Sequence, residues 1–218
     1  AQVKVEGFFF DQRKRLVEFD DVMNKQRDII YKRRRRLLLQ SQKNDATSSL
    51  KEQVLSYIKD EVNSIVSIFA PQGYTPEEYR ALIKELSKMI PFDHAAQEQL
   101  MQNVSSEPNI ERIKEKLYAV ALDTYASKEK AVGAETMRML EKVVVLSTLD
   151  EKWMDHLDSM ESLRQGIWLR GDKRTVLAEY KKEGFAMFES LIATIESTIA
   201  NKIYRIHLHN QPVGPMKV

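Results

Sequence analysis

The sequence contains no cysteine and has few of the residues that interrupt helices, with 7 glycines and 6 prolines among 218 residues. Without cysteine, disulfides, thiol nucleophiles and cysteine-based metal sites are excluded. Four prolines lie between positions 71 and 108, and the other two at positions 212 and 215. Long stretches on either side are therefore free of helix breakers. This pattern is typical of an all-α protein with long helices.

The sequence also lacks long apolar runs and a strong excess of either charge. A transmembrane helix needs about 20 consecutive, mostly apolar residues, and neither such a run nor an N-terminal apolar segment of the signal-peptide kind is present. We therefore expect any membrane role to be peripheral. The formal net charge of +2 does not indicate a nucleic-acid partner. The basic excess that exists lies in the first 40 residues.

The first long breaker-free stretch predicts one helix from Phe8 to about Gln40. Its apolar residues recur at intervals of seven: Phe8/Phe9, Leu16, Val22/Met23, Ile29/Ile30 and Leu37. A helix of about 33 residues is about 50 Å long, which exceeds what one compact core supports. We expect a spine against which other parts pack, or one strand of a coiled coil. The polar stretch 41–49 is expected to end or kink it.

Residues 57–133 have the pattern of a separate module with shorter helices. The sequence Thr75-Pro76-Glu77-Glu78 predicts a helix start, because Thr75 can cap, Pro76 needs no hydrogen bond in the first turn, and Glu78 can close a capping box. Further boundaries are expected at residues 91–93 and 105–108.

Two long helices follow, over residues 134–170 and from about residue 176. The expected apolar face of the first comprises Leu146, Leu149, Trp153, Leu157, Met160, Leu163 and Ile167. That of the second comprises Leu177, Tyr180, Phe188, Leu191, Ile195, Ile199 and Ile203. Because the break between them is so short, they must fold back as an antiparallel hairpin.

Residues 149–171 contain polar residues in an order that no general packing rule requires. The run LDEKWMDHLDSMESLRQGIWLRG is followed from residue 179 by EYKKEGFAMFESL. Together they resemble the C-terminal helical hairpin of SecA, the motor of bacterial preprotein export. Residues 1–27, with KVEG and LVEFDDVMNKQR, resemble the segment that opens the SecA helical scaffold, and residues 128–138 resemble the junction where the helical wing returns to it. The resemblance is weak across residues 41–117.

The resemblance implies a division of the chain into a scaffold, a wing and a finger. Residues 1–56 would form the first part of the scaffold, 57–133 the helical wing, 134–208 the second part of the scaffold with its two-helix finger, and 209–218 a loose tail.

By resemblance, the chain is the non-catalytic C-terminal portion of an ATP-driven preprotein translocase, excised or separately encoded. It lacks the Gly-rich phosphate loop of such motors, so we expect no ATP hydrolysis by this chain; ATP and magnesium would bind elsewhere in the full-length protein. The implied partners are the SecA nucleotide-binding domains, the SecY channel and the unfolded preprotein. The resemblance is also compatible with contact to anionic phospholipid and with a homodimer. The implied location is the cytoplasm, peripherally at the inner face of the plasma membrane or of an equivalent organelle membrane.

Site residues are implied in the same way. Docking to the motor domains would use Asp20, Asp21 and Arg27 on the polar side of the spine, together with Trp153, whose place in the apolar stripe equally suits a core residue. The finger tip contacting polypeptide and channel would be Arg170, Gly171, Asp172, Lys173 and Arg174. The family usually continues Leu-Arg-Gly with an aromatic residue, and this chain does not, so no aromatic tip contact is implied.

Three other interpretations are weighed against this one. A stand-alone helical module could bind RNA or anionic membrane through the basic run 32–36, although four consecutive arginines point around most of a helix and suit a solvated surface or an acidic protein partner better. His156, between two aspartates, could suggest metal or acid/base chemistry, but neighbours on a helix point in different directions. A structural or surface histidine is favoured. A metal-dependent four-helix enzyme would need Glu-x-x-His sets that the four histidines do not form.

Overall fold

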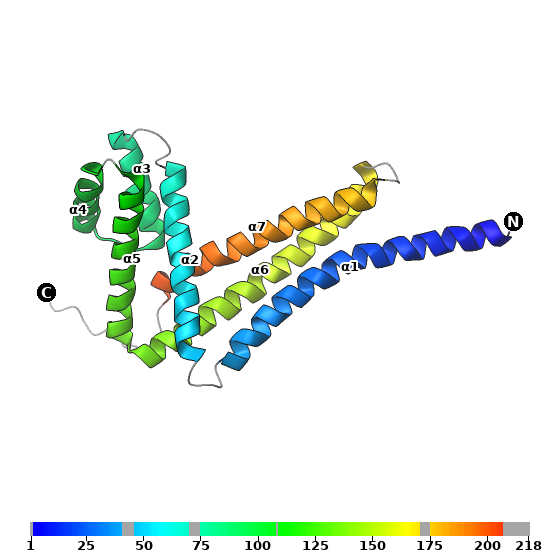
Figure 1. Ribbon diagram of the computed structural model, residues 1–218, viewed down its shortest axis with the longest axis horizontal. Coiled ribbons are helices and arrows are strands. Elements are labelled where there is room, and N and C mark those ends of the chain that lie inside the picture. The colour runs from blue at the N-terminus through cyan, green and yellow to red at the C-terminus, as the bar shows by residue number, and fades with distance from the viewer. Residues whose placement is uncertain (1, 41–45, 70–74, 108, 171–174, 207–218) are drawn as a thin grey trace. The chain divides into compact units, whose positions relative to one another are not determined.

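The computed structural model describes residues 2–40, 46–69, 75–107, 109–170 and 175–206. Within these ranges the chain forms seven α-helices and no strand (Figure 1). They are α1 (Gln2–Gln40), α2 (Ala46–Phe69), α3 (Pro76–Met89), α4 (His94–Ser105), α5 (Ile110–Val132), α6 (Ala134–Arg170) and α7 (Val176–Arg205). The predicted all-α class is confirmed.

The chain divides into two compact units. The first contains Ala1–Ser49 and Val145–Glu196, and the second contains Leu50–Val144 and Ser197–Val218. Both α6 and α7 contribute residues to each unit. These divisions differ from the scaffold, wing and finger boundaries drawn from the family resemblance, which stay predictions.

In the first unit, α1 packs against the two arms of the hairpin formed by α6 and α7. Gly184 of α7 faces Met160 of α6, and Phe188 of α7 faces His156 of α6. The residue number thus rises by four along α7 while it falls by four along α6. The arms are therefore antiparallel, as the short connection predicted. Helix α6 also begins and ends at the predicted residues.

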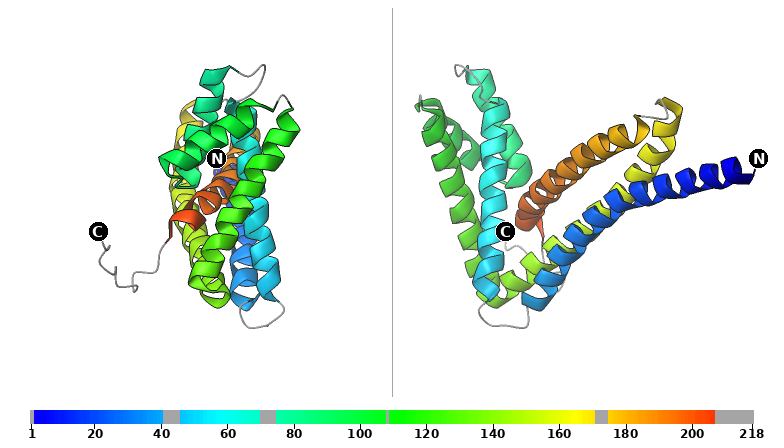
Figure 2. Two further views of the ribbon diagram at one scale, coloured as in Figure 1. Left: turned by 90° about the vertical axis from the view of Figure 1, so that its left-hand side faces the viewer. Right: turned by 45° about the vertical axis from the view of Figure 1, so that its right-hand side comes forward.

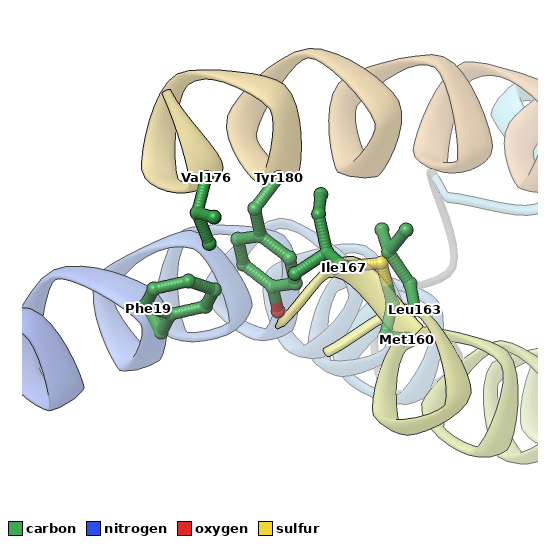
Figure 3. Packing of buried hydrophobic residues seen from close by; sticks show 6 residues of the cluster. All are labelled: Phe19, Met160, Leu163, Ile167, Val176 and Tyr180. Carbon is green, nitrogen blue, oxygen red and sulfur yellow. The ribbon is translucent and has the colours of Figure 1, made fainter. Parts of the chain in front are cut away.

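The core of this unit has contributions from all three helices. Figure 3 shows side chains converging from α1, α6 and α7. They are Phe19, Met160, Leu163, Ile167, Val176 and Tyr180. Each apolar side chain removed from water in this way stabilises the fold by about 1.5 to 3 kcal/mol. The three helices thus share one core, and none of them buries its apolar face alone.

The spine helix differs from its prediction in two respects. It begins at Gln2, six residues before Phe8, and its buried face is centred on Phe19, Ile30 and Leu37. Ile29, which was assigned to the stripe, is 50% exposed. Adjacent residues are about 100° apart on a helix, so only one member of the pair 29–30 can face the core. The side chains of residues 8, 9 and 16 lie outside the described part of the structure.

The polar stretch 41–49 ends the spine as predicted, because α1 ends at Gln40. Helix α2 begins at Ala46, so residues 46–49 are helical. Serine and threonine are tolerated in a first helical turn, where backbone N–H groups still need acceptors, and the apolar periodicity of α2 begins directly afterwards. The rest of the stretch, residues 41–45, lies outside the described residues.

In the second unit, α2, α3, α4 and α5 lie together as a bundle (Figures 1 and 2). Its fully buried side chains include Ile58, Val62, Leu82, Leu86, Ile113 and Leu117. The predicted start of α3 is confirmed: the Thr75 side chain accepts from the backbone N–H of Glu78, and the Glu78 carboxylate accepts from the backbone N–H of Thr75 at 2.8 Å.

The junction between α5 and α6 is built around Gly133, the one described residue with a positive φ, at 87°. Its N–H donates to the carbonyl of Glu129 at 2.8 Å, and its own carbonyl accepts from Met137. One glycine thus ends one helix and starts the next, in a conformation that side-chain-bearing residues rarely adopt. The predicted boundary at this position is confirmed.

A buried polar network holds this junction together. Glu141, fully buried, accepts from the Tyr125 hydroxyl and lies 2.8 Å from Arg138 Nη1. Arg138 also pairs with Glu129, which in turn pairs with Lys51 of α2 at 2.7 Å. Burial, the largest cause, raises the pKa of Glu141, while the Tyr125 hydroxyl and the Arg138 guanidinium act against that rise.

Lys128 joins α5 to the end of α7. Its Nζ donates to the carbonyls of Ile203, Tyr204 and Ile206 at 2.8, 3.0 and 2.7 Å. The last carbonyls of a helix have no partners within it and carry the negative end of the helix dipole. The half-buried ammonium of Lys128 satisfies two of them, at Ile203 and Tyr204, and the carbonyl of Ile206 just after α7, although burial lowers its pKa.

Replacing Arg138 with Met should destabilise the chain by about 3 to 5 kcal/mol, because Glu141 would keep a buried charge without its cation. Chemical denaturation followed by circular dichroism measures this. The exposed Arg112, replaced by Met in the same way, should change stability by less than about 0.5 kcal/mol.

A triple variant with Tyr125→Phe, Arg138→Met and Glu141→Leu should recover most of the loss, since replacing a whole buried polar set costs far less than breaking it. A single Arg138→Met variant as stable as wild type would contradict this account of the junction.

His156 should make stability depend on pH. Burial lowers its pKa, so between the folded pKa and the unfolded value near 6.5 the unfolded chain binds more protons. Its contribution is therefore complete above about pH 7 and is lost as the pH falls below 6.5. Thermal melts between pH 7.5 and 5.5 should show a decline that is smaller in His156→Gln; equal declines in both proteins would exclude His156 as its source.

Candidate functional site

A groove of about 410 Å³ opens in the first unit between α1 and the hairpin. Its floor is apolar and consists of Phe19, Met23, Leu157, Met160 and Tyr180. Its rim is polar and consists of Asp20, Asn24 and Arg27 from α1 and Glu161 and Arg164 from α6. We call this site the α1–hairpin groove.

The floor is rigid at one end and adaptable at the other. The rings of Phe19 and Tyr180 lie next to each other (Figure 3), with their centroids 4.5 Å apart. Burial raises the pKa of Tyr180, which keeps its hydroxyl neutral. The thioethers of Met23 and Met160 can adjust to different contacts, because methionine is unbranched and polarizable. Such a floor suits an apolar side chain from another protein.

Charge pairs organise one side of the rim. Arg164 lies 2.9 Å from Glu161 and 4.0 Å from Asp20. Hydrogen bonds from Gln165 and Arg164 hold the pKa of Glu161 below its usual value. All three charges are half exposed, so each pair adds little stability. Their main effect is to fix where charge lies around the apolar floor.

Arg27 is placed differently. Its guanidinium donates to the side-chain oxygen of Asn24 at 3.2 Å, and no carboxylate pairs with it within the part of the chain that the structure describes. Asp20, Asn24 and Arg27 are four and three residues apart, so they lie along one face of α1. Arg27 therefore presents a positive charge beside the apolar floor, where an incoming carboxylate could pair with it.

The predicted docking residues are brought together only in part. Asp20 and Arg27 lie on the rim of the groove, whereas Asp21 is exposed outside it. Trp153 is 5% exposed and fills the core, with its ring 5.6 Å from that of His156. Its role in docking stays a prediction.

The finger-tip residues Gly171, Asp172, Lys173 and Arg174 lie outside the described residues, as does the side chain of Arg170 at the end of α6. The tip assignment therefore stays a prediction. The loose tail predicted from residue 209 also lies outside the described residues.

The basic run 32–36 finds acidic partners within the chain. Arg33 pairs with Glu196 at 3.0 Å, and Arg34 forms a two-pronged pair with Asp150 at 2.8 and 3.2 Å. The hydrogen bond to Asp150, which is the largest cause, and the charge of its carboxylate raise the pKa of Arg34. Lys32 pairs with Asp28 at 2.6 Å. Two central arginines of the run are thus used to hold the fold, which weakens the case for an RNA or membrane surface.

His156 is a structural histidine, which is one of the two non-catalytic roles that the sequence favours. It is 5% exposed, and its Nε2 lies 2.8 Å from the side-chain oxygen of Gln26. Gln26 itself, together with the groove residues Asn24, Glu161 and Arg164, was not singled out from the sequence. Glutamine on a charged helix carries no mark of burial. For the rim residues other than Asp20 and Arg27, the sequence signal was the three-residue spacing of Glu161 and Arg164.

Comparison with known proteins gives a consistent result. The sequence model of the family described as SecA Wing and Scaffold domain matches residues 1–207. The protein translocase subunit SecA of Pelotomaculum thermopropionicum is 37% identical over 211 residues, which cover 95% of this chain and 23% of that protein. The SecA subunits of Desulforudis audaxviator and Halothermothrix orenii are each 36% identical, over 95% and 98% of this chain and 23% and 24% of their own lengths.

The chain therefore spans about a quarter of the length of these curated relatives. The match covers all seven helices, including the hairpin and the α5–α6 junction from which the resemblance was first drawn. On this coverage and identity, the chain belongs to the SecA wing and scaffold family.

Proposed function

We propose that this chain is the non-catalytic helical portion of a SecA-type, ATP-driven preprotein translocase. Its scaffold would dock the nucleotide-binding domains, and its α6–α7 hairpin would act as the two-helix finger. The observation that carries the proposal is the α1–hairpin groove, which combines an apolar floor with a cation that has no carboxylate partner in the described structure. The family match over residues 1–207 supports the same assignment.

The groove has the character of a protein-docking surface. Interfaces bury an apolar centre within a polar rim, and arginine and methionine are enriched there. Asp20, Glu161 and Arg164 already neutralise one another in part. Arg27 would add the recognition element, pairing with a carboxylate of the nucleotide-binding domains while an apolar residue next to that carboxylate enters the floor.

The hairpin has the properties of a stiff lever. Residues 145–170 of α6 alone would span about 39 Å at 1.5 Å per residue, and packed helices move as rigid bodies. Motion imposed at the base of such a finger would reach its tip, where residues 170–174 would meet the SecY channel mouth and the translocating polypeptide.

The remaining partners follow from this role. No described helix is long and apolar enough to cross a membrane, so attachment at the inner face of the membrane would be peripheral, through SecY and contact with anionic phospholipid. A homodimer is compatible with this role, and no nucleic acid is expected. ATP and magnesium would bind to the motor domains rather than to this chain.

Charge reversal at Arg27 should weaken docking. We expect Arg27→Glu to reduce the affinity for a fragment containing the SecA nucleotide-binding domains about tenfold, which equals about 1.4 kcal/mol. Isothermal titration calorimetry measures this. The reversal both removes the cation and places a like charge against the proposed carboxylate.

Arg35→Glu is the matched control, because Arg35 is an exposed arginine of the same helix that does not line the groove. It should leave that affinity unchanged. Equal affinities for wild type and Arg27→Glu would refute docking through the groove. A steep salt-dependent affinity for RNA or anionic vesicles, lost in Arg35→Glu, would instead favour the basic helix as the functional surface.

The finger role predicts contact at the tip. A photo-crosslinking residue at Lys173, in a complete SecA protein carrying this segment, should crosslink to a preprotein arrested in the channel. The same residue at the exposed Asn103 of α4 should not. Crosslinks of equal yield from both positions, or none from Lys173, would argue against the finger assignment.

A further inference from the structure

The face that α1 turns toward the hairpin contains two kinds of position. One set repeats every seven residues with similar aliphatic side chains: Met23, Ile30 and Leu37. Ile30 and Leu37 are buried, and Met23 is half-buried. A slip of one heptad, about 10.5 Å along the axis, that brings Leu16, Met23 and Ile30 to these three places would replace each residue with another apolar one. This set binds α1 to the hairpin but does not define where along it α1 sits.

The second set also repeats every seven residues, at Phe19, Gln26 and Arg33, but its members differ. Each has its own partner: Phe19 packs on the Tyr180 ring, and Arg33 pairs with Glu196 at 3.0 Å. These contacts cannot be exchanged by a slip. The information that fixes the register of α1 therefore lies in this set.

Gln26 is the central member and contacts both arms. It is 5% exposed, its Nε2 donates to the carbonyl of Gly184 on α7 at 2.9 Å, and its oxygen lies 2.8 Å from His156 Nε2 on α6. A carbonyl can only accept, so the amide NH₂ must face Gly184 and the amide oxygen must face the histidine. His156 therefore carries its proton on Nε2 and donates it to Gln26.

We propose that Gln26 is the positioning residue that sets the register of α1 against both arms of the hairpin. A one-heptad slip would bring Phe19 or Arg33 opposite His156 and Gly184. Neither side chain can accept the His156 N–H, which would stay buried without a partner. Gly184 leaves little space, since even a Cβ there would lie 2.9 Å from the end of Met160. A single buried polar residue fixes register in coiled coils in the same way.

The register decides the composition of the α1–hairpin groove. With Gln26 in place, α1 contributes Asp20, Asn24 and Arg27 to the rim. A slip in one direction would present residues 27, 31 and 34 to the hairpin instead. A slip in the opposite direction would present residues 13, 17 and 20. Gln26 thus selects which charges surround the apolar floor without lining the groove itself. This inference concerns the chain alone and stands whether or not the groove docks a motor domain.

The test is the distance between α1 and each arm in the full chain. Because the sequence has no cysteine, pairs of introduced cysteines carry spin labels without background: one at the exposed Lys25 of α1, the other at the exposed Ser162 of α6 or Ser190 of α7. Pulsed electron paramagnetic resonance should give one narrow distance for each pair. In Gln26→Met, which has nearly the same shape but no amide, a second population displaced along the helix axis by a heptad should appear in both pairs.

Ile30→Val is the matched control, because it removes a methylene from a fully buried position of the aliphatic set and should lower the melting temperature while keeping one narrow distance. A single wild-type distance in Gln26→Met, or equal broadening in Ile30→Val, would overturn the proposal. If Gln26→Met melts below the measuring temperature, Gln26→Asn is measured instead; its shorter amide cannot reach both arms, and a single wild-type distance in it would equally overturn the proposal.

Discussion

The first unit depends on one constraint: two hairpin arms cannot cover their own apolar faces. Met160, Leu163 and Ile167 on one arm and Val176 and Tyr180 on the other enclose the core on two sides, and Phe19 of α1 closes the third (Figure 3). Hydrophobic burial supplies the free energy but has no direction. The polar contacts of Gln26, Arg33 and Arg34 fix the position of α1 along the hairpin, because each side chain requires a particular partner.

In the second unit, the main requirement is to satisfy the backbone polar groups at the helix ends. Long helices leave unsatisfied carbonyls and N–H groups at their termini, and here Gly133, Lys128 and the Thr75–Glu78 capping box meet that need. The network around Glu141 adds a buried set of charges whose members come from α2, α5 and α6. Residues 128–138, which resemble the wing–scaffold junction of SecA in sequence, thus contain the turn from α5 to α6.

Periodicity and the placement of glycine and proline were sufficient to predict the two long helices of the hairpin, but not where α1 and α2 begin. The bounds of α6, the cap of α3 and the boundary at Gly133 follow from local chemistry that a sequence displays directly. The site was harder. Asp20 and Arg27 could be named as polar residues of the spine, but the groove beside them depends on which α6 residues lie opposite, and that is a tertiary fact. Ile29 and Gln26 show the limit most clearly: hydrophobicity favoured burying the first and exposing the second, and the packing of α1 reversed both.

The pairing of α1 residues with hairpin residues also limits how this protein can vary. Phe19 with Tyr180, Gln26 with His156 and Gly184, and Arg33 with Glu196 join positions more than 120 residues apart in sequence. A substitution on one side of a pair removes its contact unless the other side changes with it. The spine and the hairpin therefore depend on one another, and a chimera that takes α1 from one relative and the hairpin from another would lose these contacts wherever the paired residues do not match.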